Sequence, residues 1–355
     1  GNTRIWIVGD SGTAAQDYEE AAQVGDGFLS FLEDSGGEPA DLFLMLGDNA
    51  YDQGTDLEHQ KAIFDLYTEI LASTPVWPTI GNHEMGSFGV STSSDPDSYA
   101  IIGSDENGGP DPAPDSPMPY LNIFTLPTDG EVGGLASGTE QYYSFDYANV
   151  HIVSLDSQLA IRDDDGRAAM LLWLKDDLMS NDLDWTIVIF HHPPYTKGSH
   201  DSDSEYDSRG RMSAMRENIL PILEQAGVDL VVSGHSHMYE RSFLLDCAYG
   251  ASQAFSKENI VSEGIEGKHR QYIKPLAPRP HQGAIYAVAG SSSKVDQGPL
   301  DHPAHHTGLL EAGSMVIDVV DDTMIARFIN KKGQVKDSFS IQKKAGYKSE
   351  YSGCK

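Results

Sequence analysis

The sequence predicts an α/β fold in which two packed, mixed β-sheets are flanked by helices. Short apolar stretches alternate with segments of helical periodicity over the first two thirds of the chain, and strand-like stretches follow toward the C-terminus. No repeat and no linker-like segment divides the chain. We therefore expect one domain over residues 1–355, with its helices on the outer faces of the sheets.

The first part of the chain alternates strands and helices. Residues 4–8, 41–46 and 76–80 are predicted strands, because each is a short apolar run. Helices are predicted between them, over about 15–33 and 57–71. Each of the three strands is followed by a glycine and then directly by Asp or Asn.

An irregular stretch interrupts this alternation at about residues 85–138. It is rich in Gly, Ser, Asp and Pro and has no periodicity, and a loop of this length is usually functional or disordered. Because it leaves directly from a strand end, we interpret it as an insertion near the mouth of a site. Residues 120–124 are expected to anchor it.

Regular periodicity returns after the insertion, beginning with a hairpin that turns at Ala148-Asn149. The predicted elements are strands at 141–147, 150–155, 185–190 and 228–232 and helices at 168–179 and 212–225, the last interrupted near Pro221. A C-terminal β-rich part is expected at about 284–342, with strands at 284–289, 314–319, 324–329 and 336–341.

The charge of the chain limits its partners. There are 54 acidic residues against 24 Lys and Arg, for a net charge of -30. Such a surface repels nucleic acid duplexes and anionic membranes. No apolar run is long enough for a membrane span, and no feature indicates an obligate protein partner.

The two cysteines, Cys247 and Cys354, are too few for a disulfide scaffold and have the wrong pattern for a zinc ribbon. A single disulfide between them, which would suit an oxidising compartment, and two free thiols both remain open.

Side chains of metal-binding type follow five of the predicted strands. They are Asp10, Asp48, Asn82, His191, His235 and His237, with Tyr51 three residues after Asp48. A lone Asp there would be a helix cap and a lone Asn a turn residue. Their joint occurrence favours a site at the carboxyl ends of the strands, and oxygen and nitrogen ligands without thiolates suit Fe, Zn or Mn.

The number of ligands suits two ions. Two cations about 3.5–4 Å apart need a bridging anion, and Asp48 is the natural bridge. We expect Asp10, Tyr51 and His237 to complete one site, and Asn82, His191 and His235 the other. A metal-bound hydroxide at such a centre would attack a phosphate ester.

Further residues are candidates for substrate chemistry. A histidine can protonate the leaving alkoxide, and His83 is best placed because it follows a candidate ligand directly. His200 is the second candidate, and both could also bind substrate. Arg209 and Arg211 could neutralise phosphate, the alternative being that they lie on a solvated loop or helix start.

The strand-end motifs resemble the five signature blocks of the calcineurin-like metallophosphoesterases. These are Asp10-Ser11-Gly12, Gly47-Asp48-Asn49-Ala50-Tyr51, Gly81-Asn82-His83-Glu84, Val188-Ile189-Phe190-His191 and Gly234-His235-Ser236-His237. Tyr51 and the continuation to Arg241 resemble the purple acid phosphatase branch. The resemblance implies the α/β/β/α metallophosphoesterase sandwich and a bacterial member without the N-terminal domain of plant-type members.

The resemblance also implies the metals. It implies Fe(III) held by Asp10, Asp48, Tyr51 and His237, and a divalent Fe, Zn or Mn held by Asp48, Asn82, His191 and His235. His83 would contact the phosphate or act as the acid, and His200 lies where the family often has a substrate-binding histidine. A small phosphate ester as substrate and a secreted or periplasmic location follow as expectations.

Some positions depart from the family pattern. Glu84 stands where many members have Asp, and His192 with Pro193-Pro194-Tyr195 resembles bacterial phosphodiesterase-like relatives. The expected function is hydrolysis of phosphate monoesters by a metal-bound hydroxide. The alternatives are a phosphodiesterase or nucleotide-directed phosphoesterase and, more distantly, a non-catalytic metal-binding module.

Overall fold

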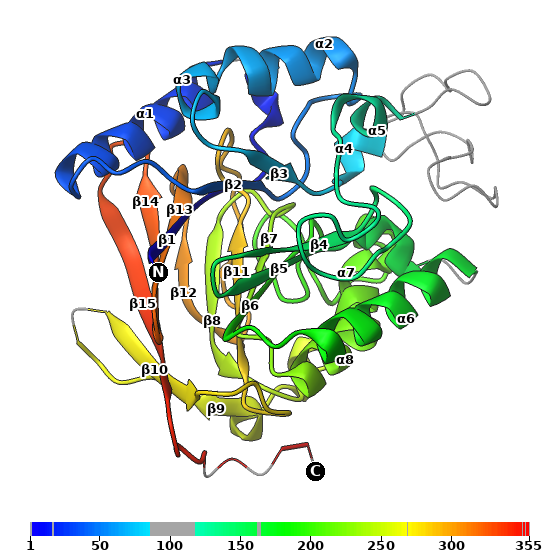
Figure 1. Cartoon of the computed structure of the whole chain (residues 1–355), viewed down its shortest axis with the longest axis vertical. Coiled ribbons are helices and arrows are strands. Elements are labelled where there is room, and N and C mark those ends of the chain that lie inside the picture. Colours follow the sequence, from blue (N-terminus) through cyan, green and yellow to red (C-terminus); the bar gives the residue numbers. More distant parts are fainter. Residues whose placement is uncertain are drawn as a thin grey trace.

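The described part of the chain forms two mixed β-sheets with helices on their outer faces, which confirms the predicted fold class (Figure 1). The structure is a computed structural model that describes residues 2–15, 18–85, 118–161, 165–267, 269–349, 351 and 353–354.

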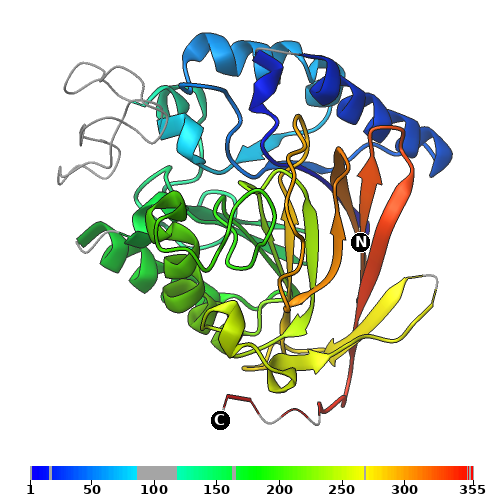
Figure 2. The same ribbon diagram turned by 180° about the vertical axis from the view of Figure 1, so that it is seen from behind.

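The first sheet has seven strands in the order β10-β15-β14-β13-β1-β2-β3. Strands β1, β2 and β3 are parallel, and β1 pairs antiparallel with β13 on its other side. Their bounds are β1 Asn2–Val8, β2 Leu42–Met45, β3 Val76–Pro78, β10 Arg270–Pro275, β13 Gly313–Val320, β14 Thr323–Asn330 and β15 Val335–Lys344. The C-terminal strands β14 and β15 lie beside the first helix (Figure 2).

The second sheet has the order β12-β8-β11-β7-β6-β5-β4, with β9 paired to β8. Strands β5, β6, β7 and β11 are parallel. The bounds are β4 Tyr143–Tyr147, β5 Val150–Ser154, β6 Trp185–Ile189, β7 Leu230–Ser233, β8 Tyr239–Leu245, β9 Ile260–Ser262, β11 Ala284–Ala289 and β12 His305–Leu309. The sequence did not predict β8, β9, β10 or β12.

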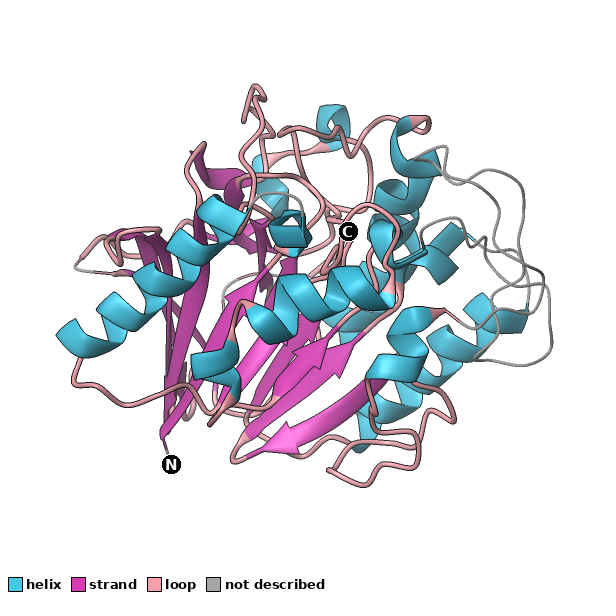
Figure 3. Cartoon of the chain, turned by 90° about the horizontal axis from the view of Figure 1, so that it is seen from above, coloured by secondary structure: helices cyan, strands magenta, loops and turns pink. Residues whose placement is uncertain are grey.

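The α-helices cover the two outer faces (Figure 3). Their bounds are α1 Tyr18–Asp34, α2 Asp56–His59, α3 Thr68–Leu71, α4 Asn82–Met85, α5 Pro119–Ile123, α6 Asp165–Ser180, α7 Arg211–Ala214 and α8 Leu220–Ala226. Among the described residues, no helix is long and apolar enough to cross a bilayer.

Two predicted helices are interrupted. Most of the predicted helix over 57–71 is helical, but it is not uniform: a π-helical turn at Gln60–Asp65 follows α2, and residues 66–67 lie outside any helix before α3 begins. The Thr68 hydroxyl donates to Phe64 O at 2.9 Å and so competes with regular main-chain bonding. The helix predicted over 212–225 is interrupted by a π-turn at Met215–Ile219.

The predicted interruption near Pro221 is confirmed, because the π-turn ends at Ile219 and α8 begins at Leu220, directly before Pro221. Pro221 lies in the first turn of α8, where a helix tolerates proline because the first N–H groups have no partner within the helix.

Strand periodicity explains the layers. Trp6 stacks on Phe28 of α1, with ring centroids 4.5 Å apart, so the alternate residues Ile5 and Ile7 face the core between the sheets. In the second sheet Ile187 belongs to that same core. Its neighbour Val188 packs instead in a separate cluster that includes side chains from α6 and α8. The order of layers is therefore helix, sheet, sheet, helix.

The expected insertion at 85–138 is described only in part, because residues 86–117 lie outside the described residues. The expected anchor overlaps α5, where the buried Tyr120 donates a hydrogen bond to Pro78 O at 2.9 Å. This bond ties α5 to the end of β3, next to the edge where the candidate ligands lie.

Candidate metal centre

The seven candidate ligands meet at the carboxyl ends of five strands, three in the first sheet and two in the second. We call them the seven-residue cluster: Asp10 after β1, Asp48 and Tyr51 after β2, Asn82 after β3, His191 after β6, and His235 and His237 after β7. All seven side chains are buried. Strands of both sheets therefore end at one buried polar site.

Half of the cluster surrounds the Tyr51 hydroxyl. Its Oη lies 3.3 Å from Asp10 Oδ1 and 3.2 Å from His237 Nε2. It also lies 3.1 Å from Asp48 Oδ2. His237 Nε2 is 3.5 Å from Asp10 Oδ1. Donor atoms with these separations can surround a single cation.

The other half surrounds His191. Its Nε2 lies 3.0 Å from Asn82 Oδ1 and 3.2 Å from His235 Nδ1. The same Nε2 lies 3.2 Å from Asp48 Oδ2, the oxygen that also faces Tyr51. One carboxylate oxygen is thus shared by both halves.

The backbone that carries these residues is unusual. Asp10, Asp48 and His235 have φ of +54°, +53° and +68°, in the left-handed region that non-glycine residues rarely adopt. Such conformations persist where the surrounding structure holds them, often at functional sites. Gly47 is required by close approach, because a Cβ there would lie 2.8 Å from His191 Nδ1.

Hydrogen bonds to the backbone and to carboxylates orient the imidazoles. His191 Nδ1 lies 2.9 Å from Leu46 O, so Nδ1–H donates to this carbonyl and the Nε2 lone pair faces the cluster. His237 Nδ1 lies 2.7 Å from Asp296 Oδ2. Asp296 was not predicted, and no local pattern could reveal it, since it lies 59 residues from His237 in the chain.

Glu84 supports the loops that carry the ligands, a role that the sequence did not predict. Its Oε2 accepts from Asp48 N at 2.9 Å and from Gly81 N at 2.6 Å. Its Oε1 accepts from Asn49 N at 2.6 Å. Burial and the neighbouring Asp48 raise the pKa of Glu84 to about 8. The one feature of the sequence that could have indicated this role is the position of Glu84 at the end of the Gly81–Glu84 motif.

The electrostatics of the cluster favour cations. Burial alone would raise the pKa of Asp48, but His191 and His83 outweigh it and hold that pKa well below its usual range. Burial, Asp48 and Asp10 raise the pKa of Tyr51 well above its usual value. A cation would therefore replace the proton on Tyr51, as metal binding generally does.

The donor geometry also fits metal ions. Ligand atoms of Asp10, Asp48 and His191 lie within 4.8 Å of one another, as do those of His191, His192 and His235. His192 Nδ1 is 2.7 Å from Ser157 Oγ, whereas its buried Nε2 has no hydrogen-bond partner among the described residues. Carboxylate, phenol, amide and imidazole donors suit Fe, Zn or Mn.

His83 and His200 both lie beside the cluster and are partly exposed. The ring of His83 lies 3.9 Å from that of Tyr51, centroid to centroid, and its backbone N–H donates to Asp48 Oδ1 at 2.8 Å. The ring of His200 stacks on His235, also at 3.9 Å.

The predicted arginines are placed differently from each other. The side chain of Arg209 is exposed, whereas Arg211 is buried and its Nη1 donates to Ser208 O at 3.0 Å. It is Ser208, which was not predicted, that touches the cluster, with its Oγ 2.5 Å from His235 Nε2. Two neighbouring residues with positive φ, Ser208 and Arg209, shape this turn.

A known protein family matches most of this chain. The family model described as Calcineurin-like phosphoesterase matches residues 3–239, a range that contains the whole seven-residue cluster. Purple acid phosphatase 22 of Arabidopsis thaliana is 32% identical over 209 residues, which cover 57% of this chain and 39% of that protein. The chain thus matches about two fifths of that relative's length.

Solved structures share the fold. Purple acid phosphatase PPD1 from yellow lupin (Lupinus luteus) seeds has a TM-score of 0.67 at 20% identity, covering 97% of this chain and 54% of that chain. GAP50, called the anchor in the inner membrane complex of Plasmodium, has a TM-score of 0.59 at 15% identity, covering 99% and 90%. At these identities the likeness shows the fold alone.

Proposed function

The chain belongs to the calcineurin-like phosphoesterase family, and from this premise we propose that it hydrolyses phosphate monoesters at a dinuclear metal centre. The observation that carries the proposal is the shared oxygen of Asp48. It lies 3.1 Å from Tyr51 Oη and 3.2 Å from His191 Nε2, as a ligand bridging two ions should.

The proposed ions occupy the two halves of the cluster. Fe(III) is assigned to Asp10, Asp48, Tyr51 and His237, and a divalent Fe, Zn or Mn to Asp48, Asn82, His191 and His235. When bound, such ions supply positive charge that lowers the pKa of a water molecule toward about 7 and offsets the charge of the phosphate. That charge matters in a chain whose net charge is -30.

His83 is the proposed acid. Its Nδ1 lies 3.0 Å from Asp52 O, so Nδ1–H donates to this carbonyl and the transferable proton is on Nε2. Packing against Tyr51 holds the imidazole of His83 beside the cluster. Because the ring is partly exposed, one of its edges is accessible to the departing alkoxide. The proton it gives up neutralises that alkoxide as the ester bond breaks.

His200 is the proposed substrate-binding residue. Its Nδ1 lies 2.8 Å from Asp207 Oδ1, and that carboxylate orients the imidazole. With Nδ1–H held by Asp207, the second nitrogen is left to donate to a phosphate oxygen.

Hydrolysis of phosphodiesters, including nucleotides, is the second candidate. The placement of the two arginines favours it, because Arg209 is exposed and Arg211 is buried beside Ser208. A diester carries less negative charge than a monoester dianion and needs fewer cations at the mouth of the site. A non-catalytic metal-binding module stays a distant alternative, since fold alone does not establish activity.

A pair of substrates tests the proposal. The protein is stripped of metal, reconstituted with iron and zinc, and assayed on an aryl phosphate monoester and on the matching bis-aryl diester. We expect kcat/KM to be higher for the monoester and to disappear on stripping. Faster diester cleavage would select the second candidate, and metal-loaded protein that cleaves neither substrate would refute hydrolysis.

The proposed location is extracytoplasmic. The Cys247–Cys354 disulfide that the structure contains supports it, because disulfides persist mainly in oxidising compartments.

A further inference from the structure

A second group of metal-binding side chains lies at the opposite end of β8 from the seven-residue cluster. Strand β8 has seven residues. His237 lies two positions before its first residue, and Cys247 lies two positions after its last residue. The strand spans roughly 23 Å at about 3.3 Å per residue. Asp246, Cys247, His281 and Cys354 each offer one ligand atom there, all within 4.8 Å of one another.

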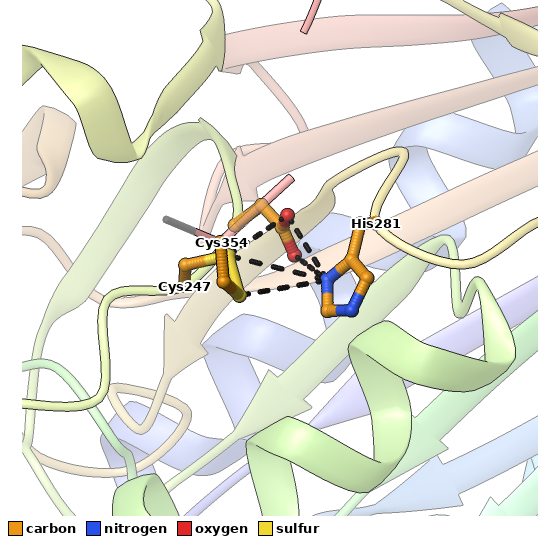
Figure 4. A group of neighbouring side chains, drawn as sticks. Cys247, His281 and Cys354 are labelled. Atoms are coloured by element: carbon orange, nitrogen blue, oxygen red, sulfur yellow. Dashed lines mark hydrogen bonds and ion pairs between the residues drawn. A yellow bond between two sulfur atoms is a disulfide. The ribbon is translucent and has the colours of Figure 1, made fainter. Parts of the chain in front are cut away.

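The two cysteines of this group form a disulfide between positions 107 residues apart (Figure 4). His281 Nδ1 lies 3.7 Å from Cys354 Sγ and 4.0 Å from Cys247 Sγ. It also lies 3.1 Å from Asp246 Oδ1, while Asp246 Oδ2 is 3.1 Å from Cys247 Sγ. A covalent crosslink alone requires neither an imidazole nor a buried carboxylate facing its sulfurs.

Contacts other than the disulfide hold these groups in place. Cys247 N donates to Glu224 Oε2 at 2.8 Å, and His281 N donates to Glu224 O at 2.9 Å. Asn259 Nδ2 donates to Cys247 O at 2.8 Å, and the side chain of Asp246 is fully buried. Asp246, Cys247 and His281 therefore keep their positions when the sulfur–sulfur bond is broken.

We propose that reduction of this disulfide by a dithiol converts the four side chains into a binding site for one thiophilic divalent cation such as Zn²⁺. The dithiol supplies two electrons and two protons, so the sulfur–sulfur bond becomes two thiols and the dithiol becomes a disulfide. Binding of the cation then displaces the two thiol protons.

The donor set fits this ion. Two thiolates, one imidazole nitrogen and one carboxylate oxygen make the four ligands of a tetrahedral zinc site. With Zn–S distances of about 2.3 Å, the two sulfurs need to separate to only roughly 3.8 Å. The seven-residue cluster contains no sulfur, so the two sites differ in chemistry and the proposal does not depend on phosphate hydrolysis.

A reductant can reach the disulfide. Cys354 is exposed, and a cavity of 530 Å³ opens beside it. Both cysteines line this cavity, together with Tyr249, Lys257, Asn259 and Tyr351. A small dithiol can enter it and attack a sulfur without prior unfolding.

Cobalt titration of the full-length protein tests the proposal. The protein is reduced under anaerobic conditions with a water-soluble phosphine, which becomes the phosphine oxide, and is then desalted and titrated with Co²⁺. We expect a thiolate-to-cobalt charge-transfer band whose intensity corresponds to one cobalt ion bound by the thiolates, which is displaced by Zn²⁺ and is absent from the oxidised protein. Cobalt bound at the seven-residue cluster cannot give this band.

Two variants check the ligand assignment. His281→Ala should weaken cobalt binding at the thiolate site by roughly 10-fold or more. The matched control His306→Ala removes a half-buried histidine outside the group and should leave the affinity unchanged. Reduced wild-type protein that unfolds, or that shows no thiolate band, overturns the proposal. An unchanged affinity in His281→Ala overturns it as well.

Discussion

The Nδ1 atom of His237 lies 2.7 Å from Oδ2 of Asp296, on the side of the ring away from Tyr51. The carboxylate accepts a hydrogen bond from Nδ1–H, so the Nε2 lone pair points at the Tyr51 half of the cluster. A carboxylate behind a ligating imidazole fixes its tautomer and makes it a better ligand. Asp296 thus acts on the candidate metal centre through His237.

Replacing Asp296 should weaken metal binding. Asp296→Asn keeps the size of the side chain but removes the charge, and we expect affinity for the ion at the Tyr51 half to fall roughly 10- to 100-fold. Competition with a chelator would measure the change. The exposed Asp301 is the matched control, and Asp301→Asn should bind metal as the wild type does.

Tyr51→Phe tests the identity of the first metal. If Fe(III) binds at Asp10, Asp48, Tyr51 and His237, the wild type has a visible tyrosinate-to-iron charge-transfer band, and Tyr51→Phe loses it. Tyr143→Phe removes another buried phenol, which donates to Pro78 O at 2.6 Å, and should keep the band. Colourless wild-type protein with two divalent ions would refute the ferric assignment.

The dependence on leaving group tests the acid. His83→Ala should lower kcat about 10²- to 10⁴-fold for alkyl phosphates, whose leaving group needs a proton. The loss should be much smaller for an aryl phosphate with an acidic phenol, because that phenolate leaves unprotonated. Equal losses on both kinds of substrate would indicate that His83 binds phosphate and does not transfer a proton.

A buried charge triad gives the structure a pH-dependent stability. Asp229 Oδ1 lies 2.8 Å from Lys274 Nζ and its Oδ2 lies 2.7 Å from Lys343 Nζ, with all three side chains buried. Burial alone would raise the pKa of Asp229, but the two lysines outweigh it and lower that pKa. Ionised Asp229 therefore stabilises the fold above about pH 3.9, and this contribution is lost as the pH falls through its lower folded-state pKa.

Asp229→Asn should lower the free energy of unfolding by about 3–5 kcal/mol near neutral pH, because it leaves two buried lysines without a counter-charge. Urea unfolding would measure it, and the difference from the wild type should narrow below about pH 4. Glu266 faces Arg270 at 3.4 Å but is 89% exposed, so Glu266→Gln should change stability by less than about 1 kcal/mol. A difference that stays constant down to low pH would exclude ionised Asp229 as its source.

The fold class was predictable from the sequence because the central strands are apolar runs that end in glycine and a polar residue. The strands that were not predicted contain both polar and apolar residues. Strand β10 contains Arg270 and Lys274, and β8 contains Arg241, which is buried against Asp337 at 2.6 Å. Such residues break the apolar pattern locally. The burial of Lys274 and Arg241 is explained only by partners far away in the chain, Asp229 and Asp337.

The seven-residue cluster was assembled from strand ends alone, because neighbouring strands bring their carboxyl ends to one edge. Its supporting residues could not be found in this way. Asp296 and Ser208 reach His237 and His235 only through the folding of loops far away in the chain. The inward-facing side chain of the loop that carries Arg209 and Arg211 could not be predicted either. The positive φ angles of Ser208 and Arg209 set which side chain of this loop points toward the cluster.

The most direct test of the dinuclear centre is the number of metal ions bound per chain in the wild type and in Asp48→Asn, with Asp177→Asn as a control. Asp177 is a buried carboxylate that contacts His151 Nε2 at 2.9 Å and has no place in the cluster. The account predicts two ions in the wild type and in Asp177→Asn, and at most one in Asp48→Asn. Two ions retained by Asp48→Asn, or a wild type that hydrolyses phosphate esters with a single ion, would contradict it.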